Sequence, residues 1–154
     1  MTGVLRVARY DGDPAEWDGF VRSRPEWTPF HLWGWKGVME RVFGHECAYL
    51  AAWGPEGNLA GVLPLVRMKS VLFGHFVMSM PFLNYGGPLG ETGAVRALVS
   101  YATSAARESG ANLLELRNRY EAAIDLPVSH RKITVATTCP TKPSGRLIGY
   151  LADP

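Results

Sequence analysis

The feature that most limits the fold is a pair of apolar segments in the middle of the chain, ECAYLAAW and LAGVLPLVRM, separated by GPEGN. Apolar runs of this length predict β-strands, and the glycines, proline and asparagine between them predict a turn. The middle of the sequence therefore predicts a hairpin. Pro64 lies inside the second strand, Leu59–Met68, and cannot donate a ladder hydrogen bond, so we expect that strand to be bulged or unpaired near this residue.

A strand and a helix are expected before this hairpin. VLRVARY, residues 4–10, has the short, β-branched and aromatic composition of a strand. Asp13 then provides an N-cap, Pro14 occupies the first helical position, and Glu16 completes a capping-box spacing. Pro25 ends this helix. Its expected apolar face consists of Trp17, Phe20 and Val21.

Two more helices are expected, one from about His31 to Phe43 and one from about Thr92 to Ser109. Gly44 and Gly110 follow them as stop signals. The expected apolar stripes are Trp35, Val38, Met39 and Val42 on the first helix, and Val95, Leu98, Ala102 and Ala105 on the second.

Three further segments, LFGHFVMSM, NLLELR and HRKITVAT, have strand composition. With the elements above they give the order β-α-α-β-β-β-α-β-β. Strands in hairpins and strands separated by helices indicate a mixed α/β layer fold.

Composition narrows the functional classes. The chain has 154 residues, 47% hydrophobic and 19% charged, which suits one globular domain. Its formal net charge of +2 comes from scattered acids and bases, so the sequence gives no signal for nucleic acid. Cys47 and Cys139 lack the spacing of a zinc site or a disulfide framework. We expect a cytoplasmic protein without a signal peptide or a membrane span.

The common catalytic motifs are missing from the sequence. His45 and Glu46 begin an HExxH pattern, but Tyr49 stands where the second histidine is needed, so we expect no metal site. Neither a GxSxG elbow nor a P-loop occurs. RESGAN, residues 107–112, departs from the glycine-rich loop that would hold the pyrophosphate of acetyl-CoA, and it ends a helix instead of opening one. We therefore expect no cofactor.

Tryptophan-rich sequence surrounds the second helix. Apolar residues at helical spacing usually form core, and Trp35 fits that interpretation. Trp33 lies off that face. With His31 and Lys36 it is a candidate for the rim of a pocket where an aromatic ring and a charge meet a polar ligand.

The segment MSMPFLNYGGPLG allows two interpretations. Gly86 and Gly87, preceded by Asn84 and Tyr85, permit positive φ or a close approach of the backbone. This is typical of a plain turn between a strand and a helix, and also of a loop that binds an anion or a carbonyl. The residues alone leave both open.

Arg117 and Arg119 follow the NLLELR strand, at the strand end where open α/β sheets place ligand groups. An arginine fork suits a carboxylate or a phosphate. The alternative is a solvated strand end, paired with Glu115 or Glu121.

The order of three segments, FHLWGWKGVMERVFGHECAYLAA, GVLPLVRMKSVLFGHFVMSMPFLNYGGPLG and LLELRNR, resembles the N-terminal half of the FemAB-like proteins. The resemblance is greatest to the branch associated with PEP-CTERM/exosortase exopolysaccharide systems. It covers about residues 5–135, and SMPFLNYGGPL with GVLPL is its most specific part.

The resemblance implies a GNAT-like fold, which FemAB-type proteins carry twice. It implies transfer of an aminoacyl group from tRNA to an amino group of a cell-wall precursor, with the acceptor held largely by the first domain and no acetyl-CoA loop. It also implies that the loop at Gly87 and Pro88 faces a ligand. The expected substrate-binding residues are Trp35, Lys36, Asn84, Tyr85, Gly86, Gly87 and Arg117.

Two departures from the family qualify these expectations. Gly37 stands where cell-wall members carry a precursor-binding lysine, although Lys36 is adjacent. The second GNAT-like domain is also missing, so we expect residues 1–138 to form one domain and 139–154 an irregular tail of a truncated copy. Exposed apolar surface is then expected around NLLELR and KITVAT, with self-association or a separate partner domain. The alternative functions are a non-catalytic interaction module and a small acetyl-CoA-dependent N-acetyltransferase.

Overall fold

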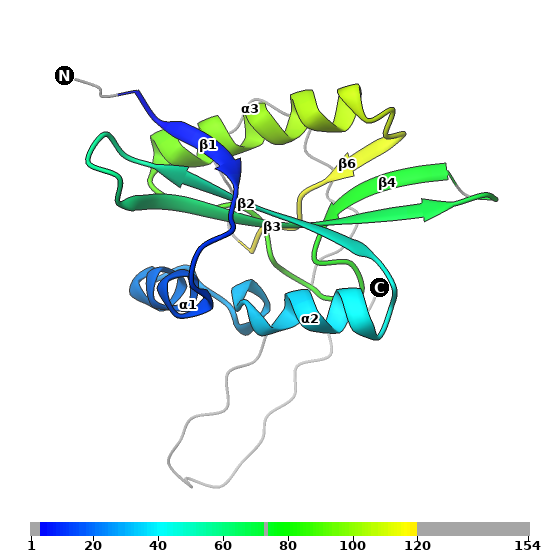
Figure 1. Ribbon diagram of the computed structural model, residues 1–154, viewed down its shortest axis with the longest axis horizontal. Coiled ribbons are helices and arrows are strands. Elements are labelled where there is room, and N and C mark those ends of the chain that lie inside the picture. Colours follow the sequence, from blue (N-terminus) through cyan, green and yellow to red (C-terminus); the bar gives the residue numbers. More distant parts are fainter. Residues whose placement is uncertain (1–3, 73, 120–154) are drawn as a thin grey trace, which may run out of the picture.

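The computed structural model describes residues 4–72 and 74–119. They form a six-stranded sheet in the order β1-β2-β3-β4-β6, with β5 beside β3. Helix α3 covers one face of the sheet, and α1 and α2 cover the other (Figure 1), as in the expected mixed α/β layer fold. The elements are β1 (Arg6–Arg9), α1 (Pro14–Ser23), a 3-10 turn η1 (Pro29–His31), α2 (Gly34–Arg41), β2 (Glu46–Trp53), β3 (Leu59–Ser70), β4 (Gly74–Ser79), β5 (Leu89–Gly90), α3 (Thr92–Glu108) and β6 (Leu113–Glu115).

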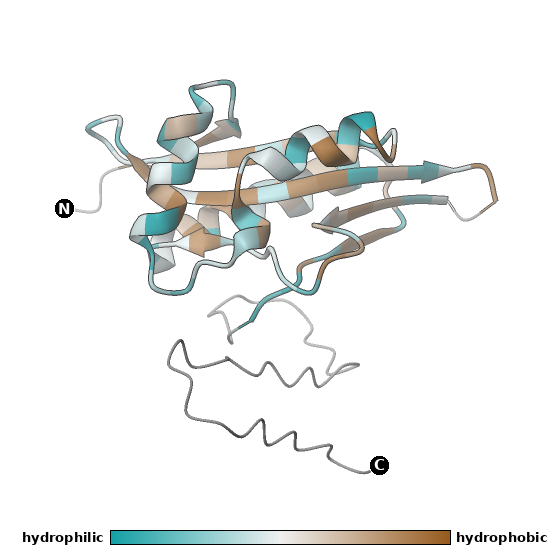
Figure 2. Ribbon diagram, turned by 90° about the horizontal axis from the view of Figure 1, so that it is seen from below, coloured by the Kyte–Doolittle hydropathy of each residue, from teal (hydrophilic) through white to brown (hydrophobic). Residues whose placement is uncertain are grey.

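The central hairpin is β2 and β3, paired antiparallel as expected. In its turn the Gly54 amide donates to the Asn58 carbonyl at 2.9 Å, and Gly57 has a positive φ of 82°. Hydrophobic residues run along these strands between the helical layers (Figure 2). All other strand pairs are antiparallel too, except β4 and β6, which run parallel on either side of the α3 crossover.

The expected break near Pro64 is present on one side of β3. Towards β2 the ladder continues, with Pro64 opposite Tyr49. On the other side β4 reaches only Leu65, and β5 begins its pairing at Val62. Residues 63–64 therefore have no strand partner there, and the chain between β4 and β5 leaves the sheet at this gap.

Helix α1 begins as the sequence predicts. The Asp13 carboxylate accepts a hydrogen bond from the Ala15 amide at 2.8 Å, and Trp17 and Val21 are fully buried. The expected role of Glu16 in a capping box is wrong. Its carboxylate instead accepts a hydrogen bond from the Tyr10 hydroxyl at 2.6 Å, which ties the helix to the end of β1.

The second helix is shorter than predicted, because η1 replaces its first turn and α2 ends at Arg41. Met39 is buried, but Val42 is 71% exposed, so its place in the apolar stripe is wrong. Val42 is the C-cap, where the helical face no longer continues. Gly44 follows with a φ of 67°, as expected for the stop signal.

Helix α3 has nearly the predicted bounds, and Gly110 follows it with a φ of 69°. Its buried face is turned slightly from the expected one, because Val95 and Ala105 are only half-buried. Because the sheet is twisted, the residues of α3 that pack against it differ slightly from those that a regular helical repeat predicts. The buried residues are Ala94, Leu98, Val99, Ala102 and Ala106.

Expected surface features lie partly within the described residues. Leu113 on β6 is 45% exposed, whereas Leu114 and Leu116 of the same segment are half-buried against the core beneath α3, so the expected exposed apolar surface at NLLELR stays a prediction. The predicted strand HRKITVAT, with Ile133 and Val135, lies outside the described residues, as does the tail at 139–154. Within residues 4–72 and 74–119, no helix is both long and apolar enough to cross a membrane.

Candidate functional site

A hollow of about 450 Å³ opens where the end of β1 meets the start of β2 and α2. We refer to it as the Trp33 pocket. It lies on the face of the sheet that α1 and α2 cover. Its lining residues are Arg9, Tyr10, Asp11, Gly12, Trp33, Lys36, Glu40, Glu46, Cys47 and Tyr49.

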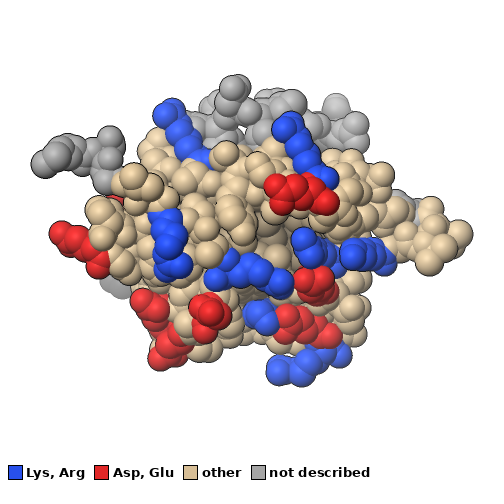
Figure 3. All heavy atoms as spheres, turned by 45° about the horizontal axis from the view of Figure 1, so that its top comes forward, with Lys and Arg blue, Asp and Glu red and all other residues tan. Residues whose placement is uncertain are grey.

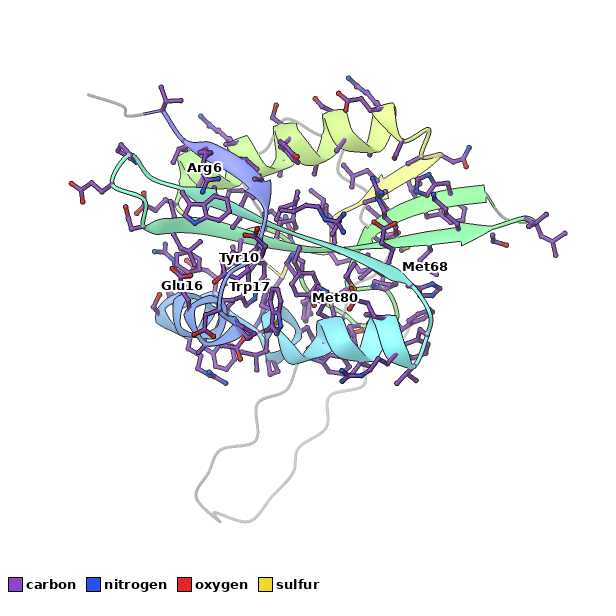
Figure 4. The ribbon with its side chains drawn as sticks, viewed as in Figure 1. Arg6, Tyr10, Glu16, Trp17, Met68 and Met80 are labelled. Atoms are coloured by element: carbon purple, nitrogen blue, oxygen red, sulfur yellow. The ribbon has the colours of Figure 1, made fainter. Side chains whose placement is uncertain are left out.

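Three rings form the inner wall of the pocket. Trp33 makes edge-to-face contacts with Tyr10 and Tyr49, with ring centroids 5.5 and 5.4 Å apart. Trp17 packs behind them, 5.3 Å from Tyr10 and 5.1 Å from Tyr49. Figure 4 shows Tyr10 and Trp17 side by side between the sheet and α1. These ring contacts stabilise the arrangement, so the wall is a closely packed aromatic surface.

The charges at the pocket rim form pairs from neighbouring elements. Lys36 Nζ lies 2.7 Å from Glu40 Oε1, one helical turn away, and 5.8 Å from the ring centroid of Trp33. Arg9 Nη2 lies 3.3 Å from Glu46 Oε1 and donates to the Cys47 carbonyl. Among the charged lining residues, only Asp11 forms no hydrogen bond or ion pair with the described part of the chain.

Burial holds the weakly acidic groups of the pocket in their neutral forms. It raises the pKa of the Cys47 thiol to about 12. It also raises the pKa of the Tyr49 hydroxyl, and that of Tyr10, which the neighbouring Glu16 raises further. Near pH 7 the pocket therefore presents these three side chains as a neutral thiol and two neutral phenols.

The expected pocket rim around Trp33 is present in part. Trp33 and Lys36 both line the pocket, but His31 does not. His31 is the buried last residue of the 3-10 turn η1, and its ring contacts Thr28 and the Gly87 carbonyl. Trp35 also lies outside the lining, and its indole donates to the Pro29 carbonyl at 3.0 Å.

The remaining expected site residues gather elsewhere, where β4 and β6 separate. The amides of Gly86 and Gly87 both donate to the Arg117 carbonyl, at 3.1 and 2.9 Å. The Arg117 amide donates to the hydroxyl of Ser79, the last residue of β4, at 2.7 Å. The loop after β4 thus binds a carbonyl, and that carbonyl belongs to this chain.

The Arg117 side chain completes this connection. Its guanidinium donates to Glu115 Oε1 at 2.7 Å and to the Leu83 carbonyl at 2.8 Å. This is the paired strand end considered as the alternative to a ligand site. Asn84 is exposed and Tyr85 is half-buried on the same loop. The structure therefore joins Gly86, Gly87 and Arg117 but leaves Lys36 in a separate pocket.

His31, at the end of η1, also binds the glycine loop. The Thr28 amide donates to His31 Nδ1 at 3.1 Å, so Nε2 carries the proton and donates to the Gly87 carbonyl at 3.0 Å. Burial lowers the pKa of His31, which keeps the ring neutral. The loop is held by both Arg117 and His31.

The start of α3 does not have the form of a pyrophosphate loop. The two residues before its N-cap form β5, which pairs with β3. The N-cap is Glu91, whose amide donates to the Ala60 carbonyl at 3.1 Å. A carboxylate at this position repels an anion from the helix N-terminus. Among the described residues, no group of three or more His, Cys, Asp or Glu could hold a metal ion.

Comparison with known proteins identifies the type of fold. No protein-family model and no curated protein matches the sequence. Among solved structures, a GNAT family acetyltransferase from Staphylococcus aureus is similar, with a TM-score of 0.51 and 10% identity, over 88% of this chain and 100% of that one. The chain has a GNAT-like fold. This confirms the expected fold class, and at this identity the likeness extends to the fold alone.

Several pocket residues were missed by the sequence reasoning. Cys47 and Tyr49 alternate along β2 and so point to one face, a period that marks them as neighbours. Arg9, Asp11 and Glu46 reach the pocket through the pairing of β1 with β2, a long-range contact without a local signal.

Proposed function

We propose that the chain is the acceptor-binding domain of a FemAB-like acyl or aminoacyl transferase, which forms an amide on a cell-envelope or exopolysaccharide-related acceptor and is inactive alone. The observation that carries this proposal is a pocket with a closely packed aromatic wall and one unpaired carboxylate, in a domain with a GNAT-like fold. The resemblance of the sequence to FemAB-like proteins supports the reaction class.

The charge of the pocket favours an amine as the group that it binds. Lys36 pairs with Glu40, and Glu46 is shared by Arg9 and Arg67, so Asp11 is the pocket carboxylate that a ligand can still pair with. An ammonium group is also attracted to the faces of aromatic rings. An amine is the group that an amide-forming transferase must acylate.

The remaining expected site residues have a different part in this proposal. Gly86 and Gly87 act on the acceptor indirectly, by keeping the loop close to Arg117, since a Cβ on either residue would collide with Met80 or Asn118. Asn84 and Tyr85 are the polar side chains of that loop and remain candidates for acceptor contacts. Trp35 supports η1 through its hydrogen bond to Pro29.

A complete acetyl-CoA-dependent N-acetyltransferase is the second candidate, because the similar solved structure is a GNAT family acetyltransferase. The described start of α3 argues against it. Glu91 supplies a negative charge where the pyrophosphate of acetyl-CoA would need positive charge and free amides.

Calorimetric titration tests the proposal with two matched peptides, one with free lysine amines and one with the same amines acetylated. We expect only the free peptide to bind, and Asp11→Asn to weaken it by about tenfold, which corresponds to ~1.4 kcal/mol. Glu56→Gln, which removes an exposed carboxylate from the β2–β3 turn, is the control and leaves binding unchanged.

Two results would contradict the proposal. Equal binding of both peptides would mean that the pocket does not select an amine. Micromolar binding of acetyl-CoA, tightened further by Glu91→Arg, would transfer support to the acetyltransferase.

A further inference from the structure

The two hairpins of the sheet have turns of opposite character. The β2–β3 turn, GPEGN, is polar, and its residues 55–58 are exposed. The β3–β4 turn instead carries Val71, 105% exposed, and Leu72, 85% exposed. Since the first turn shows that this chain closes a hairpin with polar residues and glycine, the apolar pair is not needed to make a turn.

The apolar tip is an extension of ordered strands. The β3–β4 pairing continues to Ser70 opposite Gly74, and the Leu72 amide donates to the Ser70 hydroxyl at 3.3 Å. The tip projects beyond the rest of the domain at the end of the hairpin (Figures 1 and 2), where it is coloured hydrophobic in Figure 2. A medium that surrounds the projecting tip can cover both apolar side chains. A flat protein surface would contact only one side of the tip.

The charged residues near the tip indicate which kind of surface the tip can contact. The sequence from residue 57 to residue 90 contains no aspartate or glutamate, and the exposed Lys69 lies in β3 just before the tip. Arg67 shares a face of the strand with Lys69 but is ion-paired with Glu46 at 3.4 Å, so Lys69 is the cation that this hairpin can present to another surface. In Figure 3 the protruding end carries no charged group, and the charged group nearest to it is a Lys or Arg. This pattern is complementary to a negatively charged surface.

We propose that the β3–β4 tip inserts Val71 and Leu72 into the interface of an anionic lipid membrane, with Lys69 at the headgroups. Two aliphatic side chains alone give weak, reversible binding, and the nearby cation adds attraction to anionic headgroups, so we expect the attachment to be reversible. The attachment brings the domain to the membrane surface without crossing it. It is independent of the Trp33 pocket, which lies where β1, β2 and α2 meet.

Vesicle sedimentation of the full chain tests this attachment. We expect binding to vesicles of phosphatidylcholine mixed with phosphatidylglycerol, and about fivefold less to phosphatidylcholine alone. Val71→Ser with Leu72→Ser should abolish binding to both, and Lys69→Gln should reduce binding to the anionic vesicles only. Val42→Ser is the matched control, because Val42 is an apolar residue, 71% exposed, at the end of α2.

The proposal is overturned if the chain fails to sediment with anionic vesicles, or if the double serine variant sediments as well as the Val42→Ser control. It is also overturned if the tip mediates self-association, seen as a change in gel-filtration mass that the double variant removes without any change in vesicle binding. Far-UV circular dichroism checks that each variant is folded. We expect all of them to be folded, because the substituted positions are exposed.

Discussion

The two faces of the sheet are built from different side chains. Large rings and long side chains fill the space beneath α1 and α2, whereas alanine and leucine fill the space beneath α3. Gly61 brings α3 close to the sheet, because a Cβ there would lie 2.9 Å from the Ala94 Cβ. Small residues permit close packing on one face, and the rings that remain partly uncovered on the other form the Trp33 pocket. The comparison indicates that α3 closes the core on one face, and under the proposed function the aromatic face is the one that binds the acceptor.

The largest expected effect is on the free energy of unfolding, when a large side chain is removed from the core on each face of the sheet. Trp17 is fully buried and its indole donates to the His31 carbonyl at 2.8 Å. Trp17→Ala should therefore lower the free energy of unfolding by about 3–5 kcal/mol, and Leu98→Ala by about 2–5 kcal/mol. Urea denaturation measures both.

The two variants should differ in ligand binding. Leu98→Ala removes contacts beneath α3 only, so its affinity for an amine ligand should equal that of the parent chain under conditions where it is folded. Trp17→Ala removes the ring behind Tyr10 and Tyr49 and should weaken binding. Equal loss of affinity in both variants would show that the faces are not separate in function.

The next effect tests the close contact beneath α3. Gly61→Ala places a methyl group against Ala94 and Leu98 and should destabilise the chain by about 1–3 kcal/mol through overpacking. Gly93→Ala is the control, because its added methyl group would lie 3.7 Å from Leu5 Cδ1, an ordinary contact. The control should be neutral or slightly stabilising, by up to about 1 kcal/mol, since alanine favours a helix over glycine. Thermal melting that ranks the two variants in the opposite order would contradict the close packing of α3.

The same contrast explains what the sequence could predict. The N-cap at Asp13, the polar turn and the stop at Gly110 act through neighbours in the chain, so local patterns reveal them. Val42 was misplaced because a helical repeat does not say where the last turn ends. The contacts of Arg117 with Ser79 and Leu83 join residues more than 30 positions apart, and only the folded sheet brings them together. The pocket was foreseen through Trp33 and Lys36, which lie on one helical turn, but its β-strand side was not.

His31 links the aromatic face to the glycine loop and gives a pH-dependent effect. Burial lowers its pKa below the ordinary value of 6.5, so the unfolded chain takes up a proton at a higher pH than the folded chain does. Stability from this residue is full above about pH 6.5 and is lost as the pH falls below it, by up to about 1.4 kcal/mol per pH unit.

His31→Gln should remove this slope. The amide of glutamine can donate to the Gly87 carbonyl, but it does not titrate. Urea denaturation between pH 5 and pH 8 compares the two chains, with the other histidines present in both. An unchanged slope in His31→Gln would mean that another group causes the acid sensitivity.

The smallest effect on stability is expected at the pocket rim. Lys36→Met removes the ion pair with Glu40, whose side chains are 27% and 37% exposed. An i,i+4 pair at this exposure contributes only about 0.3–0.5 kcal/mol, because solvent screens it and both side chains lose freedom in forming it. The substitution leaves the Glu40 carboxylate unpaired beside Asp11, so the pocket becomes more negative. We therefore expect Lys36→Met to leave the urea midpoint nearly unchanged and to tighten binding of the free-amine peptide. Weaker binding would mean that Lys36 itself contacts an anionic part of the acceptor, and the matching Glu40→Gln variant would then bind more tightly than the parent chain.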